Sequence, residues 1–194
     1  MSTPRLILAS ASPRRQELLR EAGYAFRVYP ADVDESDVPP DLAPGDVAEY
    51  LAGRKAAAVA ALFPDDVVLA ADTVVALADE VLGKPADAAH ARRMLARLSG
   101  TRHEVITGVS VVRPAAGFAR RVRVTSAVSM RPLSAAEVDT YVATGQWQGK
   151  AGGYGIQDDD PFVTRTAGSL TNIVGLPMDE TAAVLREAGV MPRG

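Results

Sequence analysis

The chain has 194 residues, of which 47% are hydrophobic and 23% are charged, and its formal net charge is −3. This composition predicts one globular domain, residues 1–194, with a substantial core. The negative charge argues against nucleic acid as a partner of the whole surface, while a small anion in a local basic pocket stays compatible with it. The absence of cysteine excludes disulfides, a thiolate nucleophile and a cysteine zinc site.

The N-terminal residues and the lengths of the apolar segments indicate the cellular compartment in which we expect the protein. Residues 1–5 lead straight into an apolar run at residues 6–9, which is too short for a signal peptide. The longest apolar stretch, residues 67–78, is interrupted by Asp72 and cannot span a bilayer. We therefore expect a cytoplasmic protein with no membrane partner.

The first predicted elements are a strand, a turn and a helix. The strand covers residues 6–9, Ser12 is a suitable N-cap, Pro13 is a suitable first helical residue, and Gly23 ends the helix. A short strand is predicted at residues 26–29.

An acidic, proline-rich loop at residues 32–44 precedes a second predicted helix at residues 46–62. A loop of this length is often functional. Lys55 lies on the apolar stripe of the helix, so its side chain either extends to solvent or points into a cavity. The stripe consists of Leu51, Ala58 and Leu62.

The rest of the chain alternates strands and helices. A buried strand at residues 67–71 is predicted to break at Asp72–Thr73 and to be followed by a hairpin at residues 74–82. Segments 101–113 and 118–130 predict a long antiparallel pair, so the fold class is α/β or α+β with a mixed sheet. The other predicted elements are a helix at 87–98 with Ala91, Met94, Leu95 and Leu98 inward, a helix from the Ser134–Glu137 capping box through Tyr141, a glycine-rich loop at 145–155 and a helix at 179–188.

The segment that begins at Ser10 places Arg14 and Arg15 in the first turn of a helix. Cations are unfavourable there because the helix macrodipole is already positive at that end. An anion held by free backbone N–H groups, hydroxyls and guanidinium groups would account for the arrangement. A capped surface helix with two solvated arginines is the alternative.

Two acidic segments are candidates for catalysis or metal binding. Asp72 follows an apolar strand, a common position for a metal ligand or a general base, although a strand-end aspartate can also simply make a turn. The loop that contains Glu35 could supply a second carboxylate or form a solvated face. Because carboxylates and a polyphosphate repel one another, a divalent cation such as Mg²⁺ would bridge them.

The chain has 18 arginines and only three lysines, Lys55, Lys84 and Lys150. The compact ammonium group suits a phosphate oxygen, although a few lysines can also persist by chance. Gln157, after the glycine-rich loop, offers one acceptor and two donors, enough to read the imide edge of uracil or thymine. A flexible surface loop is the alternative interpretation.

Common motifs of other enzyme classes are absent. The sequence has no P-loop, no dinucleotide-binding glycine motif, no zinc-protease motif and no nucleophile elbow. The two histidines, His90 and His103, have no partner at an informative spacing, and we expect both to be surface or edge residues.

In their order along the chain, these segments resemble the Maf family (septum formation protein Maf) of nucleoside triphosphate pyrophosphatases. The resemblance implies a mixed twisted sheet flanked by helices, with two lobes around a cleft, similar to the inosine triphosphate pyrophosphatases. It also implies a divalent cation, Mg²⁺ or Mn²⁺, and a homodimer. The matching stretches are residues 8–19, 33–35, 71–75, 83–85, 150–157 and 174–177.

The resemblance implies a role for each site residue. Asp72 would accept the proton of the attacking water and, with Glu35, hold the metal. The branch that hydrolyses thymidine and uridine triphosphates is matched at Arg14, Thr73 and Gln157, whereas the 7-methyl-GTP branch carries glutamine and glutamate at the last two positions. The phosphate-binding residues would be Ser10, Arg15, Lys55 and Lys84.

The predicted reaction is therefore hydrolysis of dTTP and UTP to the monophosphate and pyrophosphate. Alternatives are modified pyrimidine nucleotides, 7-methyl-GTP, and a nucleotide-binding regulator of cell division without turnover. Trp147 is expected to anchor its loop, with stacking on a base as the alternative.

Overall fold

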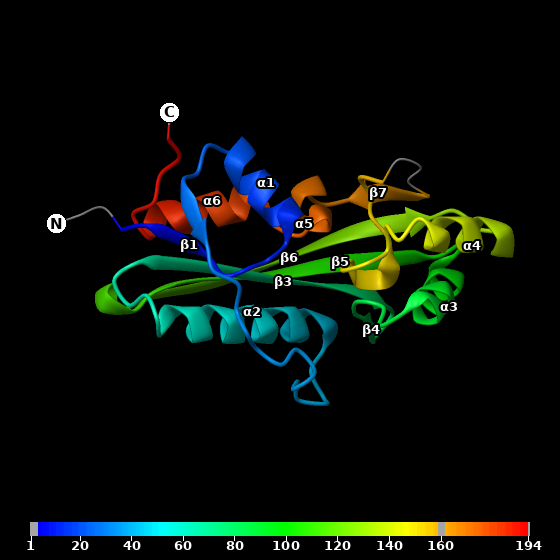
Figure 1. Cartoon of the computed structure of the whole chain (residues 1–194), viewed down its shortest axis with the longest axis horizontal. Helices are drawn as coiled ribbons and strands as arrows, with labels where there is room; N and C mark the ends of the chain where they lie inside the picture. Colours follow the sequence, from blue (N-terminus) through cyan, green and yellow to red (C-terminus); the bar gives the residue numbers. More distant parts are fainter. Residues whose placement is uncertain (1–3, 159–161, 194) are drawn as a thin grey trace.

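The computed structural model describes residues 4–158 and 162–193 and is built around a seven-stranded mixed sheet (Figure 1). The strands lie in the order β2-β1-β3-β5-β6-β7, and the short β4 pairs with β3. β1 is parallel to both of its neighbours, and the other pairs are antiparallel. The expected mixed α/β sheet is thus confirmed. The strands are β1 (Leu6–Leu8), β2 (Phe26–Val28), β3 (Val67–Leu77), β4 (Glu80–Leu82), β5 (Arg102–Arg113), β6 (Phe118–Met130) and β7 (Val163–Ala167).

Helices cover both faces of this sheet. α2 lies across one face, α1, α5 and α6 lie on the other, and α3 and α4 lie together near the far end of the long strands (Figure 1). Among the described residues, no helix combines the length and the apolar character that crossing a membrane requires. The helices are α1 (Pro13–Glu21), α2 (Pro44–Ala60), α3 (Ala88–Leu98), α4 (Ala135–Ala143), α5 (Leu170–Val174) and α6 (Met178–Glu187), with short 3₁₀ turns η1 (Pro114–Ala116) and η2 (Ala151–Gly153).

The helix ends follow the predicted local signals. The Ser12 hydroxyl caps α1 by accepting from the Arg15 backbone N–H, and Pro13 is the first helical residue. Ser134 and Glu137 form both hydrogen bonds of the predicted capping box at the start of α4. The four residues predicted to face inward on α3 are all buried. Side-chain caps and apolar periodicity thus place these helices as expected.

β3 does not break at Asp72–Thr73, so that prediction is wrong. β5 pairs with β3 continuously across this position. On the opposite side, β1 pairs only as far as Leu69, and the pairing with β4 starts at Val75. Within the described part of the chain, residues 70–74 therefore have an unpaired edge on that side, because a neighbouring strand ends there while β3 itself continues.

The predicted apolar stripe of α2 is partly wrong. Leu51 is buried, but Ala58 is exposed, and Leu62 is 58% exposed and lies beyond the end of the helix at Ala60. The buried face is centred on the row that contains Lys55, so Leu51 lies at its rim and Ala58 just outside it. The prediction that Lys55 lies on the buried side is confirmed.

Close contact between α2 and the sheet depends on a glycine in β5. A Cβ atom at Gly108 would lie 2.6 Å from the carbonyl carbon and oxygen of Ala48 in α2. These are backbone atoms, which cannot move aside independently of the helix. Gly108 therefore sets how closely α2 approaches the strand that pairs with Asp72.

Two hydrophobic clusters pack on the sheet face opposite α2. One joins β1 and β3 to α1 and α6, and the other joins β5 and β6 to α3 and α4. Ile156, in the glycine-rich loop, packs against both. The two clusters correspond to the expected lobes, and the cavity described next lies where they meet.

Candidate active site

A cavity of about 500 Å³ opens at the unpaired edge of β3. The turn after β1, the start of α1 and the loop at residues 148–158 form its walls. Every predicted site residue lines it, so the structure brings all of them together. They are Ser10, Arg14, Arg15, Glu35, Lys55, Asp72, Thr73, Lys84 and Gln157.

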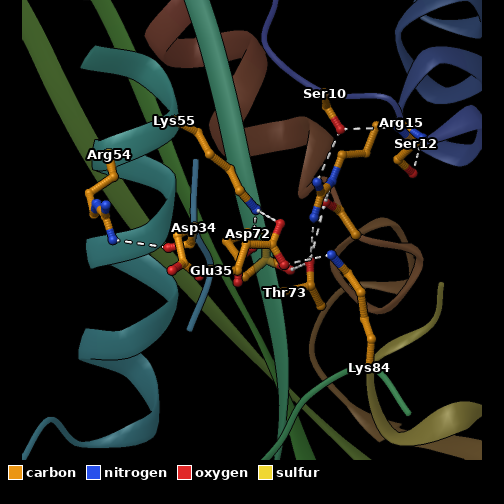
Figure 2. Close-up of polar contacts among 12 residues, drawn as sticks. Ser10, Ser12, Arg15, Asp34, Glu35, Arg54, Lys55, Asp72, Thr73 and Lys84 are labelled. Carbon is orange, nitrogen blue, oxygen red and sulfur yellow. Dashed lines mark hydrogen bonds and ion pairs between the residues drawn. The ribbon is translucent and has the colours of Figure 1, made fainter. Parts of the chain in front are cut away.

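Arg15 is fixed by three protein acceptors on one wall (Figure 2). Its Nε donates to the Gly175 carbonyl at 2.7 Å, Nη1 to Ser10 Oγ at 3.2 Å and Nη2 to Thr73 Oγ1 at 3.0 Å. Burial lowers the pKa of Arg15 from its usual value, and the negative charge of Asp72 opposes that shift. Arginine stays charged in proteins, and two of its five N–H groups remain for an anion.

The Thr73 hydroxyl is committed to protein partners. Thr107 Oγ1 donates its single hydrogen to the carbonyl of Asn172 at 3.1 Å, so in the 2.9 Å contact between the two threonines Thr73 is the donor. The same Thr73 oxygen accepts from Arg15. Thr73 therefore has no hydrogen left for a ligand, and its hydroxyl orients the guanidinium.

On the face of β3 that points toward α2, a row of alternating charges connects four residues (Figure 2). Lys55 Nζ lies 2.5 Å from Asp72 Oδ1 and 2.7 Å from Glu35 Oε1. Lys84 Nζ lies 2.8 Å from Glu35 Oε2. The side chains of Lys55 and Asp72 are only 8% and 7% exposed, so this pair is buried, whereas Glu35 and Lys84 are near solvent.

Both lysines stabilise the ionised form of Glu35. Burial raises the pKa of this carboxyl, but hydrogen bonds and charge from Lys55 and Lys84 outweigh it and lower the pKa from 4.5 to about 2. Glu35 is therefore a carboxylate at any pH near neutrality. The acidic loop contributes a charged residue to the cavity and not only a solvated face.

The donor set fits a divalent cation that a substrate helps to bind. Among residues 4–158 and 162–193, no group of three or more His, Cys, Asp or Glu side chains forms a complete metal site. Asp72 and Glu35 nevertheless converge on the same atom, Lys55 Nζ. Two carboxylates completed by substrate phosphates are the usual way in which proteins hold Mg²⁺.

The sequence analysis missed a buried ion pair in the glycine-rich loop. Lys150 Nζ bonds Asp158 Oδ1, and the two side chains are 13% and 9% exposed. Asp158 Oδ2 accepts from the Tyr141 hydroxyl at 2.7 Å and from the Gly155 N–H at 2.9 Å. Asp158 is the first of three consecutive aspartates, a run that reads as a solvated segment. The pair brackets Gln157, and all three residues line the cavity.

The structure also tests the predictions for His103 and Trp147, because it shows how far each side chain is buried. His103 is not a surface residue: it is 3% exposed, its Nε2 lies 2.7 Å from the Tyr154 hydroxyl, and burial lowers its pKa to about 4. It is therefore neutral near pH 7. Trp147 is 7% exposed and donates to the Val142 carbonyl at 3.0 Å, which confirms that it anchors its loop.

Comparison with known proteins identifies the family of the chain. The sequence model of one family, described as Maf-like protein, matches residues 5–188. The chain belongs to the Maf family. Its relatives include proteins named dTTP/UTP pyrophosphatase, and the match extends over nearly the full length of both chains.

Two of these Maf relatives and one solved structure can each be aligned with nearly the whole of this chain. The protein from Anaeromyxobacter dehalogenans (strain 2CP-C) is 53% identical over 96% of this chain and 95% of its own length. The protein from Cereibacter sphaeroides is 51% identical over 95% of each. A nucleoside-triphosphatase / dITP/XTP pyrophosphatase from Mycobacterium abscessus gives a TM-score of 0.48 at 18% identity over 95% of each chain.

Proposed function

We propose that this chain is a nucleoside triphosphate pyrophosphatase that converts dTTP and UTP to the monophosphate and pyrophosphate. The observation that carries the proposal is the row of charges at the unpaired edge of β3. It places a buried carboxylate, Asp72, among the cations Lys55 and Lys84 in a cavity large enough for a nucleotide. Membership of the Maf family and the names of the relatives support the same activity.

Asp72 is the proposed proton acceptor. Its Oδ1 is bound to Lys55, Oδ2 makes no hydrogen bond to any described residue, and Asp72 lines the cavity. A water molecule at Oδ2 would lose its proton to this oxygen as it attacks the α-phosphorus, and the bond from that phosphorus to the pyrophosphate oxygen would break. Lys55 holds the carboxylate of Asp72 in position through its contact with Oδ1.

The cations supply the electrostatic part of catalysis. Arg15 keeps two free N–H groups, and its orientation is fixed by Ser10, Thr73 and Gly175 before a substrate arrives. Lys84 is half-exposed, at the mouth of the cavity. Preorganised donors directed at phosphate oxygens stabilise charge that develops in the transition state. We assign phosphate binding to Ser10, Arg15, Lys55 and Lys84.

The base is assigned to the wall formed by Arg14 and Gln157. Gln157 supplies an acceptor for the N3–H group of uracil or thymine and a donor for a neighbouring carbonyl oxygen. Thr73 contributes indirectly, because its hydroxyl is committed to Arg15 and Thr107. We therefore propose that Thr73 contributes to specificity by supporting Arg15.

A charge count supports a divalent cation, Mg²⁺ or Mn²⁺. The cavity is lined by five cationic side chains and three carboxylates, which leaves two positive charges in excess. A triphosphate carries about four negative charges near neutral pH, so a divalent cation would balance the remainder. Glu35 and Asp72 would hold it, and it would supply Lewis-acid stabilisation of the phosphate oxygens. The homodimer and the cytoplasmic location stay predictions.

The experiment measures pyrophosphate release from dTTP, UTP, CTP and 7-methyl-GTP, with and without Mg²⁺, by wild type and Asp72→Asn. We expect metal-dependent release from dTTP and UTP, and a loss of at least about 1,000-fold in kcat for the variant with its fold intact. Release from 7-methyl-GTP alone would retain the chemistry and overturn the pyrimidine specificity. Nucleotide binding by folded wild type without release would instead support the regulator of cell division.

A further inference from the structure

Recognition of uracil or thymine needs one more donor than Gln157 can give. The base edge presents the acceptor O4, the donor N3–H and the acceptor O2, so a complete reader supplies a donor, an acceptor and a donor. The Gln157 amide supplies two of these at once. Because the amide group can turn over, the same side chain can also pair with the N4 amine and N3 of cytosine. Glutamine alone therefore does not distinguish UTP from CTP.

Two cationic side chains that line the cavity, Arg14 and Lys150, carry donors that can complete this pattern, and Arg14 Nη2 already donates to the Gly149 carbonyl at 3.5 Å. The Thr73 hydroxyl has no hydrogen available, as its bonds to Arg15 and Thr107 show. Lys150 Nζ carries three N–H groups, one of which points to Asp158. Two remain, and Lys150 lines the same cavity as Gln157. An ammonium has no acceptor, so it can bond a carbonyl oxygen but not an amine.

The position of the Lys150 ammonium is fixed. Its partner Asp158 is itself held by the Tyr141 hydroxyl and by the Gly155 N–H. A Cβ atom at Gly155 would lie 2.7 Å from Lys150 Nζ and 2.6 Å from Asp158 Oδ1, so the ion pair packs directly against the backbone two residues before Gln157. Such support gives a donor the directional precision that base recognition requires.

Lys150 belongs to a different ion pair from the lysines assigned to phosphate binding. Asp158 is bonded to no other cationic side chain among the described residues, so the pair as a whole is neutral. Lys55 and Lys84 belong to a separate row with Glu35 and with Asp72, the proposed proton acceptor. A neutralised ammonium adds little attraction for a polyanion but keeps its hydrogen-bond donors.

We propose that Lys150 is a specificity-determining residue whose Nζ donates to O4 of uracil or thymine, with Asp158 as its positioning residue. Gln157 then pairs with N3–H and O2. Cytosine would direct its N4 amine at the ammonium, leaving two donors opposed and unpaired. The site rejects CTP for that reason. This inference rests on the proposed pyrophosphatase activity toward pyrimidine nucleoside triphosphates.

The test compares kcat/KM for UTP and CTP in wild type, Lys150→Met and Lys150→Met/Asp158→Asn. The double variant removes both charges, so it keeps the loop free of an unpaired buried carboxylate if the single variant folds poorly. We expect the UTP-to-CTP ratio to fall by about 10- to 100-fold in either variant, because one charged hydrogen bond to O4 is lost. Lys150→Arg should retain part of the preference.

A substrate analogue tests the proposed hydrogen bond between Lys150 and O4 of the base directly. In 4-thio-UTP the O4 atom is replaced by sulfur, a weaker acceptor. Wild type should therefore favour UTP over this analogue, and Lys150→Met should not. Arg93→Met serves as the matched control, since it removes an exposed positive charge on α3 outside the cavity. It should leave both ratios unchanged.

Two outcomes overturn the inference while leaving the proposed function in place. An unchanged UTP-to-CTP ratio in folded, active Lys150→Met would show that Lys150 does not read the base. An equal loss for both nucleotides, with weaker inhibition by inorganic pyrophosphate, would assign Lys150 to phosphate binding. Failure of wild type to release pyrophosphate from UTP would instead refute the proposed function itself.

Discussion

The buried pair of Lys55 and Asp72 gives a quantitative test of how the site is held together. In Lys55→Met, the carboxylate of Asp72 loses the only cation bonded to it among the described residues, while it stays 7% exposed. Removing one partner of a buried pair costs about 3–5 kcal/mol, because the remaining charge is uncompensated. For a chain of this size, each kcal/mol shifts Tm by about 2–4 °C, so we expect Tm to fall by about 6–20 °C.

A double-mutant cycle shows whether the loss of stability in Lys55→Met comes from the unpaired, buried carboxylate of Asp72. Asp72→Asn alone should be milder, because Lys55 keeps its 2.7 Å contact with Glu35. Lys55→Met/Asp72→Asn should be more stable than Lys55→Met, since no unpaired buried charge is left. The assay is urea or thermal unfolding at pH 7 followed by circular dichroism. A Tm within about 2 °C of wild type for Lys55→Met, or a double variant less stable than Lys55→Met, would refute the reasoning.

The remaining predictions concern packing and pH. Gly108→Ala should lower the free energy of unfolding by about 1–3 kcal/mol because its Cβ meets the Ala48 backbone, whereas Gly83→Ala, with open space around it, should change it little in the same urea titration. The pKa of Glu35 falls from 4.5 in the unfolded chain to about 2 in the fold. Its ionised form therefore stabilises the protein above pH 4.5, and that contribution is lost as the pH falls toward 2. Unfolding curves between these values should show a shallower pH dependence in Glu35→Gln, and an identical dependence would contradict the assignment.

Structural features that depend on residues within about one helical turn of each other could be predicted from the sequence. The caps at Ser12 and Ser134 and the buried face of α3 depend on residues three or four positions apart, and all were confirmed. The order of the motif segments indicated the family, and the residues that this resemblance singled out line one cavity. Local chemistry and motif order together were therefore enough to predict which residues lie in the candidate site.

Features set by distant partners could not be predicted in this way. His103 is buried beside Tyr154, 51 positions away, and the two side chains share a hydrogen bond. Asp158 looks solvated in its acidic run, yet it is enclosed by Lys150 and Tyr141. Ala58 and Leu62 fit the helical period but fall outside the face that the sheet covers. In each case a contact partner far away in the sequence decides burial, and single-sequence periodicity contains no information on it.

The Asp72–Thr73 pair shows why a polar break in an apolar strand can mark the end of a neighbouring strand. Successive side chains of a strand point to opposite faces, so Asp72 meets Lys55 below the sheet and Thr73 meets Arg15 above it. Because β1 stops pairing at Leu69 and β4 starts at Val75, a ligand at this edge can reach both faces at once. Extending either neighbour across residues 70–74 would cover this edge. The polar pair is therefore compatible with a continuous β3, because the interruption lies in the adjacent strands.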